Sequence, residues 1–185
     1  KSSGNKSGDS RNHIFARSDI NLDFENFDES KLSINYQRTS NDTYLKVHDI
    51  NSKIMGNNTI MNSSIAMNFS KNDSSMKINM DVYEDLSKTD ERYEFVAPNY
   101  NYKNKLSISE ELGMLSFQSR GYYKNYETNK YTTFLTNDVI WNPGSKITKK
   151  GFVNTLQGMI KNTNYEAKNT TDYKTEGTIN ELGGV

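Results

Sequence analysis

The 185-residue sequence contains no cysteine and only two histidines. Without cysteine, the chain has no disulfide, no thiolate metal ligand and no cysteine nucleophile. His13 lies where a polar N-terminal segment meets the first expected strand, and His48 fits an exposed strand position. Two histidines in these positions make a Ser-His-Asp catalytic set or a zinc site improbable. We expect no catalytic residues, no metal site and no cofactor, and we expect that the protein is not an enzyme.

The sequence also lacks an excess of either charge, with 23 Lys and Arg against 23 Asp and Glu. No overall electrostatic field therefore draws the chain to nucleic acid or to an acidic membrane, and such binding has to come from a local patch. No apolar run is long enough for a spanning helix, so we expect no transmembrane segment. The sequence begins at Lys1 rather than at methionine, which predicts a processed or trimmed product.

Residues 1–12 contain Ser, Gly, Asn, Lys and other polar residues with no apolar member. Such a segment cannot offset the entropy cost of ordering, and we expect a flexible polar tether. Its composition resembles the mature start of a bacterial surface lipoprotein. We therefore expect an extracellular or cell-surface attached protein, and the abundance of Asn and Lys is typical of an AT-rich genome, such as that of a Gram-positive bacterium.

Alternation of apolar and polar residues predicts strands through most of the chain. The alternation is clear at residues 20–24 and 32–36 and weaker at residues 45–47. Residues 65–69 and 76–82, joined by a polar loop, predict a hairpin with one apolar and one polar face. Further strands are expected before Pro98, where the missing amide hydrogen should end ladder pairing, and again around residues 115–117 and 131–141.

One segment has a helical period instead. Phe152, Val153, Leu156, Met159 and Ile160 recur at spacings of three and four, which predicts an amphipathic helix over residues 147–162. The fold class that we predict is mainly β: an antiparallel sandwich or strongly curved sheet with this one C-terminal helix packed on it. The expected organisation is a tether at residues 1–12, a single β-rich domain at 13–168 and a loose polar tail at 169–185.

Two acidic patterns need an interpretation. Residues 19–25 carry oxygen-bearing side chains at every second position, as a calcium loop does. However, Phe24 stands where such a loop needs glycine and Ser30 where it needs glutamate, which favours an acidic solvent face. Adjacent carboxylates at residues 84–85, 90–91 and 110–111 could serve glycoside hydrolysis, but neighbours on a strand point to opposite faces, which favours simple solvation.

A band of tyrosines and cations is the strongest indication of a binding site. Seven of the twelve tyrosines lie between Tyr93 and Tyr131, interleaved with Lys and Arg. Rings beside mobile cations suit sugars or unstacked bases, although half-exposed strands also favour tyrosine for packing alone. The candidate ligand-binding residues are Tyr100, Tyr102, Lys103, Lys105, Arg120, Tyr122, Tyr123, Lys124, Tyr126, Lys130 and Tyr131.

Together these patterns predict a non-enzymatic extracellular surface binding or structural module. It would be adhesin-like, either a lipoprotein ectodomain or a pilin-head-like subunit. Its partner would be an extracellular polymer, nucleic acid or glycan, or another surface protein. The alternative is a carrier of a small apolar ligand or lipid, held between a curved sheet and the helix and lined by flexible methionines.

Overall fold

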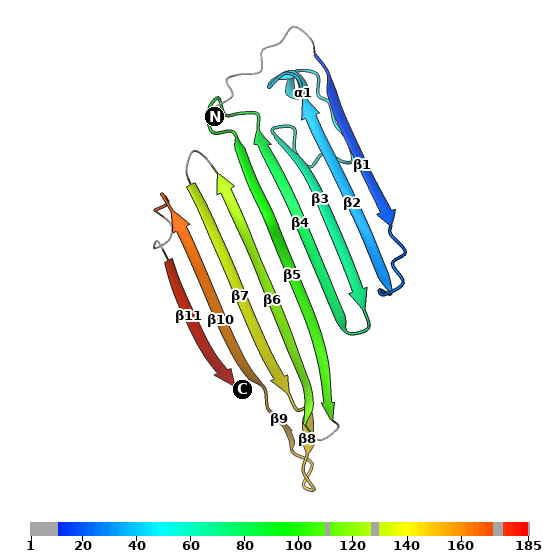
Figure 1. Ribbon diagram of the computed structural model, residues 1–185, viewed down its shortest axis with the longest axis vertical. Helices are drawn as coiled ribbons and strands as arrows, with labels where there is room; N and C mark the ends of the chain where they lie inside the picture. Colours follow the sequence, from blue (N-terminus) through cyan, green and yellow to red (C-terminus); the bar gives the residue numbers. More distant parts are fainter. Residues whose placement is uncertain (1–10, 110–111, 127–129, 172–175, 185) are drawn as a thin grey trace.

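The computed structural model describes residues 11–109, 112–126, 130–171 and 176–184, and this part of the chain is mainly β. Figure 1 shows one broad sheet whose strands lie side by side, with a short helix at one end and a narrow hairpin projecting from the other. The elements are β1 (His13–Asn21), β2 (Glu29–Thr39), α1 (Tyr44–Val47), β3 (Ile60–Lys71), β4 (Ser74–Asp85), β5 (Tyr93–Ser109), β6 (Gly113–Tyr126), β7 (Lys130–Asn142), β8 (Ser145–Ile147), β9 (Val153–Thr155), β10 (Gly158–Lys168) and β11 (Glu176–Gly184).

The main sheet is an antiparallel meander. Within the described residues, nine strands follow one another in the order β1-β2-β3-β4-β5-β6-β7-β10-β11, and β8 pairs only with β9. Each strand pairs with its neighbour in sequence, apart from the excursion of β8 and β9 between β7 and β10. The expected sandwich is therefore not formed within the described chain, which has a single layer.

The register sorts the side chains onto two chemically different faces, because successive residues of a strand point to opposite sides. Ile34 pairs with Ile65, and Ile65 pairs with Met80. We call the side that these three residues share the apolar face. Its other apolar and aromatic members include Ile14, Ile20, Leu32, Tyr36, Met61, Met67, Phe69, Met76, Ile78, Val82, Tyr93, Phe95, Tyr100, Tyr102, Leu106, Leu115, Phe117, Tyr123, Tyr131, Leu135, Val139, Trp141, Ile160 and Leu182.

The opposite side, which we call the polar face, carries mostly amides, hydroxyls and charges. Its members include Lys31, Ser33, Asn35, Asn68, Ser75, Lys77, Asn79, Asn99, Asn101, Lys103, Lys105, Gln118, Arg120, Lys124, Lys130, Thr132, Thr136, Asp138, Lys161 and Thr163. Such one-sided patterning is typical of an antiparallel sheet that buries one face and hydrates the other. Here both faces lie open within the described residues.

Burial is correspondingly sparse. The described hydrophobic residues that are buried are Leu45, Met61, Leu86 and Ala167. The first three form a small cluster at the end of the sheet where α1 lies. Beside it, the buried guanidinium of Arg92 donates to Asp42 from both terminal nitrogens, and its Nε lies 3.3 Å from Glu84 Oε1. The sheet therefore depends mainly on its backbone ladder and cross-strand pairs rather than on a central core.

The predicted helix over residues 147–162 is wrong. Ile147 ends β8, residues 148–152 turn, and β9 and β10 follow. Gly151 adopts a φ of +84°, which an α-helix does not use, and the Phe152 amide donates to Thr148 Oγ1 at 3.1 Å. The apolar residues that we placed on one helical stripe instead lie in the β8–β9 hairpin and in β10.

Two smaller predictions are also wrong. Residues 45–47, expected in a strand, belong to α1, and His48 caps that helix instead of lying on a strand face. Pro98 does not end its strand, because β5 continues from Tyr93 to Ser109. The register shifts between Val96 and Asn99, so a bulge accommodates the residue that cannot donate to the ladder.

The hairpin predicted from residues 65–69 and 76–82 is confirmed as β3 and β4, with Phe69 opposite Met76 and Ile65 opposite Met80. The strands run closer to the turn than expected, ending at Lys71 and resuming at Ser74. Residues Glu176–Gly184, in the segment expected to form a tail, make the edge strand β11. Of the expected tether, residues 1–10 lie outside the described residues. No helix in the described part has the length and hydrophobicity needed to cross a membrane.

The Arg92 cluster yields a stability prediction. Arg92→Ala leaves the carboxylates of Asp42 and Glu84 without their buried cation, and we expect the free energy of unfolding to fall by about 3 kcal/mol. Arg17→Ala removes an exposed arginine that pairs with Asp19 at 3.4 Å and should cost less than about 1 kcal/mol. Urea denaturation followed by circular dichroism measures both, and equal effects of the two substitutions would contradict the account.

Candidate binding surface

The sheet divides the predicted tyrosine and lysine band between its two faces. Seven of the eleven candidate residues lie on the polar face: Lys103, Lys105, Arg120, Tyr122, Lys124, Tyr126 and Lys130. The other four lie on the apolar face: Tyr100, Tyr102, Tyr123 and Tyr131. All five cations of the band therefore gather on one side, while the tyrosines do not form one surface with them.

The bulge at Pro98 accounts for part of this division. Phe95 and Tyr100 are five residues apart and would face opposite sides in a regular strand. The extra residue between Val96 and Asn99 brings both onto the apolar face. There the Tyr100 ring lies over Gly121, where an added Cβ would come within 2.9 Å of the ring.

Several cations of the polar face already have anionic partners. Arg120 lies 3.6 Å from Asp138, and Lys124 lies 2.9 Å from Glu94. The Lys124 ammonium also lies 5.0 Å from the centre of the Tyr126 ring. Within the part of the chain that the structure describes, Lys77, Lys103 and Lys105 form no ion pair.

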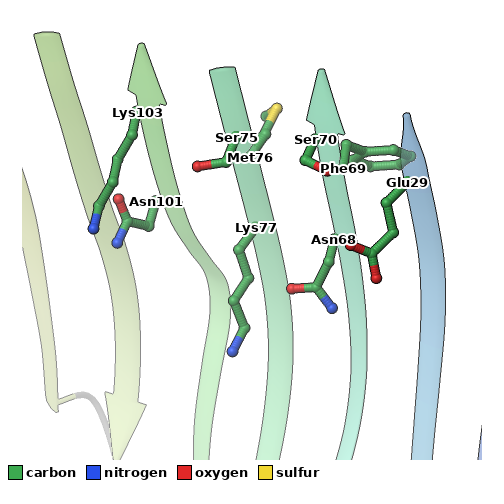
Figure 2. A pocket seen from close by; sticks show the side chains of 9 residues that line it. All are labelled: Glu29, Asn68, Phe69, Ser70, Ser75, Met76, Lys77, Asn101 and Lys103. Atoms are coloured by element: carbon green, nitrogen blue, oxygen red, sulfur yellow. The ribbon is translucent and has the colours of Figure 1, made fainter. Parts of the chain in front are cut away.

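An open pocket of about 270 Å³ is lined by two of these lysines, Lys77 and Lys103. Figure 2 shows Lys77 and Lys103 with the amides of Asn68 and Asn101 on neighbouring strands. The lining residues are Glu29, Asn68, Phe69, Ser70, Ser75, Met76, Lys77, Asn101 and Lys103. By register, all of these except Phe69 and Met76 belong to the polar face. The pocket thus offers two cations, one carboxylate and several hydrogen-bonding groups.

The polar groups around the pocket continue across the sheet in rows. Lys77 pairs with Asn68 on one side and with Asn101 on the other, and Asn101 pairs with Arg120. Gln118 Nε2 donates to Asn101 Oδ1 at 3.1 Å, which holds that amide in place. Cross-strand neighbours are about 4.8 Å apart, so the row presents evenly spaced polar side chains to a ligand that lies across the strands.

The aromatic rings of the polar face stack on one another rather than standing free. The Tyr122 and Phe134 centroids are 5.4 Å apart with planes inclined by 27°, and Phe134 and Tyr165 are 5.7 Å apart at 21°. Tyr165 in turn lies over Gly177, where an added Cβ would come within 2.5 Å of the ring. This ladder across β6, β7, β10 and β11 stabilises the sheet and leaves few ring faces for stacking on a base.

Two ionisable groups near these features have displaced pKa values. Burial raises the pKa of Asp81, and the nearby Lys77 ammonium partly offsets that effect. On the apolar face, Tyr131 donates a hydrogen bond to Glu166, which together with partial burial raises the pKa of the phenol.

The sequence did not single out Lys77, Asn68 or Asn101, which form the centre of the pocket. Lys77 stands between Met76 and Ile78, so the alternation in this hairpin predicts that Lys77 lies on the polar face. Its pairing with Asn101 depends on the register of β4 against β5, which local sequence does not specify. Among the described residues, no three His, Asp or Glu side chains are close enough to share a metal ion.

Comparisons with known proteins found no match: no protein-family model, no curated protein and no solved structure resembles the chain significantly. Its function therefore has to follow from its own residues.

The raised pKa of Asp81 gives a prediction with a definite sign. Because burial raises this pKa above the usual range of an aspartate, the ionised carboxylate is less favourable in the folded than in the unfolded chain. Asp81→Asn should therefore raise the free energy of unfolding at pH 7 by up to about 0.5 kcal/mol, as a surface substitution does. The gain should shrink as pH falls towards 4 and the wild-type carboxyl becomes protonated. Urea titrations at pH 7 and pH 4 test this, and a gain that grows at low pH would contradict it.

Proposed function

We propose that the protein is a non-enzymatic, cell-surface attached extracellular module that binds an anionic polymer, foremost an acidic glycan, along its polar face. The observation that carries this proposal is the pocket of Lys77 and Lys103 set in rows of amides and hydroxyls. Ammonium groups that form no direct ion pair attract carboxylates, and Asn and Ser side chains both donate to and accept from sugar hydroxyls.

The arrangement favours a glycan over single-stranded nucleic acid. Base stacking needs exposed ring faces. Tyr122, Phe134 and Tyr165 direct theirs at one another, and Lys124 lies over Tyr126. Uronic-acid or similarly charged sugars need no stacking, because ion pairs and hydrogen bonds to the ring substituents suffice. The even spacing of the polar rows suits a ligand that is itself repetitive.

A second candidate function is supported by a different surface. The apolar face carries exposed methionines, including Met67 and Met80, at 40% and 53% exposure. Such adaptable side chains suit a carrier of a small apolar ligand or lipid. The helix that was expected to close the binding space is not formed, and the hollows found on this face are open. Lipid that co-purifies with the protein and is identified by mass spectrometry would favour this candidate over polymer binding.

The polymer hypothesis predicts that Lys77→Ala/Lys103→Ala weakens binding of fluorescein-labelled alginate oligosaccharide about tenfold, since each exposed ion pair contributes up to about 1 kcal/mol. Binding by the wild type should also weaken as salt rises, because exposed charges are screened. Fluorescence anisotropy measures both effects.

The matched control is Lys149→Ala/Lys150→Ala, which removes the same charge from exposed positions outside the pocket and should leave affinity unchanged. Equal losses in both double variants would indicate that only net charge matters and would contradict a built site. Labelled single-stranded DNA serves as a second probe, and tight binding of DNA without binding of alginate would contradict the choice of glycan.

A further inference from the structure

Away from the α1 end, where Met61 and Glu84 are buried, the apolar face is a large surface that no described element covers. At its centre Met80 is 53% exposed and Ile65 is 48% exposed. Ile160 in β10 is 57% exposed, and Leu182 in the edge strand β11 is 85% exposed. So many exposed apolar side chains on one side of a sheet favour an occupant, because large apolar patches mark interaction surfaces.

The total surface shows that the chain is far from closed on itself. All 185 residues together expose 12701 Å², whereas a folded monomer of 21.2 kDa is expected to expose about 9,100 Å². This excess of about 3,600 Å² belongs to the whole chain, both faces and the chain ends included. About a quarter of it equals the roughly 800 Å² that each partner buries in a standard protein interface.

No described charged side chain lies in the middle of the apolar face, which suits such a contact. Its charged side chains lie at the two ends of the sheet. At the end near α1 they are Arg38, Glu84, Glu166, Lys168 and Glu176, and at the tip of the β3–β4 hairpin there is Lys71. Two copies can thus bring their centres together without burying an unpaired charge.

A row of polar side chains that crosses the apolar face indicates the kind of occupant. The Ser119 hydroxyl donates to Asn137 Oδ1 at 2.8 Å and accepts from the Tyr100 hydroxyl at 3.1 Å. In register with them, Asn162 donates to Asn180 at 2.7 Å. Neither Asn137 nor Asn180 uses its amide nitrogen as a donor within the described residues.

This polar row disfavours a lipid or membrane occupant and favours a second copy of the chain. In hydrocarbon, the unused amide donors would lose their water without gaining a partner. An amide carries both donors and an acceptor, so a row of asparagines can pair with the same row on an identical chain. An isologous contact about a twofold axis brings like surfaces together in this way.

We propose that two copies of this chain pack apolar face against apolar face to form a β-sandwich. Two sheets packed in this manner lie about 10 Å apart with their strands nearly aligned, as in other sandwiches. The dimer completes the two-layer architecture that a single sheet lacks and directs both polar faces to solvent. This inference stands independently of polymer binding, because it rests on the other face.

The test is sedimentation velocity of the whole chain from low to high micromolar concentration. The wild type should sediment as a species of twice the 21.2 kDa of one chain. Met80→Asp at the centre of the apolar face and Leu182→Asp on its edge strand should each weaken the dimer at least about tenfold, because every dimer would then bury two carboxylates. Leu182 is so exposed that its replacement leaves the fold of one chain intact.

The matched control is Ile179→Asp, which makes the same chemical change on the same strand but on the polar face, at a side chain that is 50% exposed. It should dimerise like the wild type. A wild type that remains monomeric at high micromolar concentration would overturn the proposal. So would a dimer that Ile179→Asp weakens as much as Leu182→Asp and Met80→Asp do.

Discussion

The antiparallel hydrogen-bond ladder is the constraint on which the rest of this structure depends. A single layer of strands has no central core, and only a few of the described hydrophobic side chains are buried, most of them in the small cluster of Leu45, Met61 and Leu86. Once the ladder fixes the register, every side chain is assigned to one face or the other. The apolar face, the polar face and the pocket between Lys77 and Lys103 all follow from that assignment.

The two faces have different physical roles. The polar face has its own stabilising network, with ion pairs such as Arg120 with Asp138 and an aromatic ladder through Phe134. A polar ligand would contact its remaining amides and the lysines that form no ion pair. The apolar face is complete only when another surface covers it. A sandwich of two copies would therefore place two polymer-binding faces on opposite sides of one particle, and binding at both would raise avidity without new contacts.

Local sequence predicted the strands whose alternation is strict, as in the hairpin that pairs Ile65 with Met80. Prediction from local sequence failed where the spacing of apolar residues fits a helix although the segment forms strands. The spacing of Phe152, Leu156 and Met159 fits a helix, but Gly151 and the Thr148 turn bend the chain back instead. Local sequence also could not assign the tyrosines to a face of the sheet. The bulge at Pro98 changes the face of Tyr100, and no local signal gives the register of β4 against β5.

The apolar face is open over most of its extent in a single chain and, in the proposed dimer, is covered when two chains associate. Because the chain has no cysteine, single cysteines can report on each face: Met80→Cys on the apolar face and Lys77→Cys on the polar face, both in β4. The measurement is their rate of reaction with a water-soluble maleimide across dilution. The account predicts that both react fast when dilute and that only the Met80→Cys protein slows as concentration rises. Protection of that cysteine at every dilution, or equal rates at all concentrations, would contradict it.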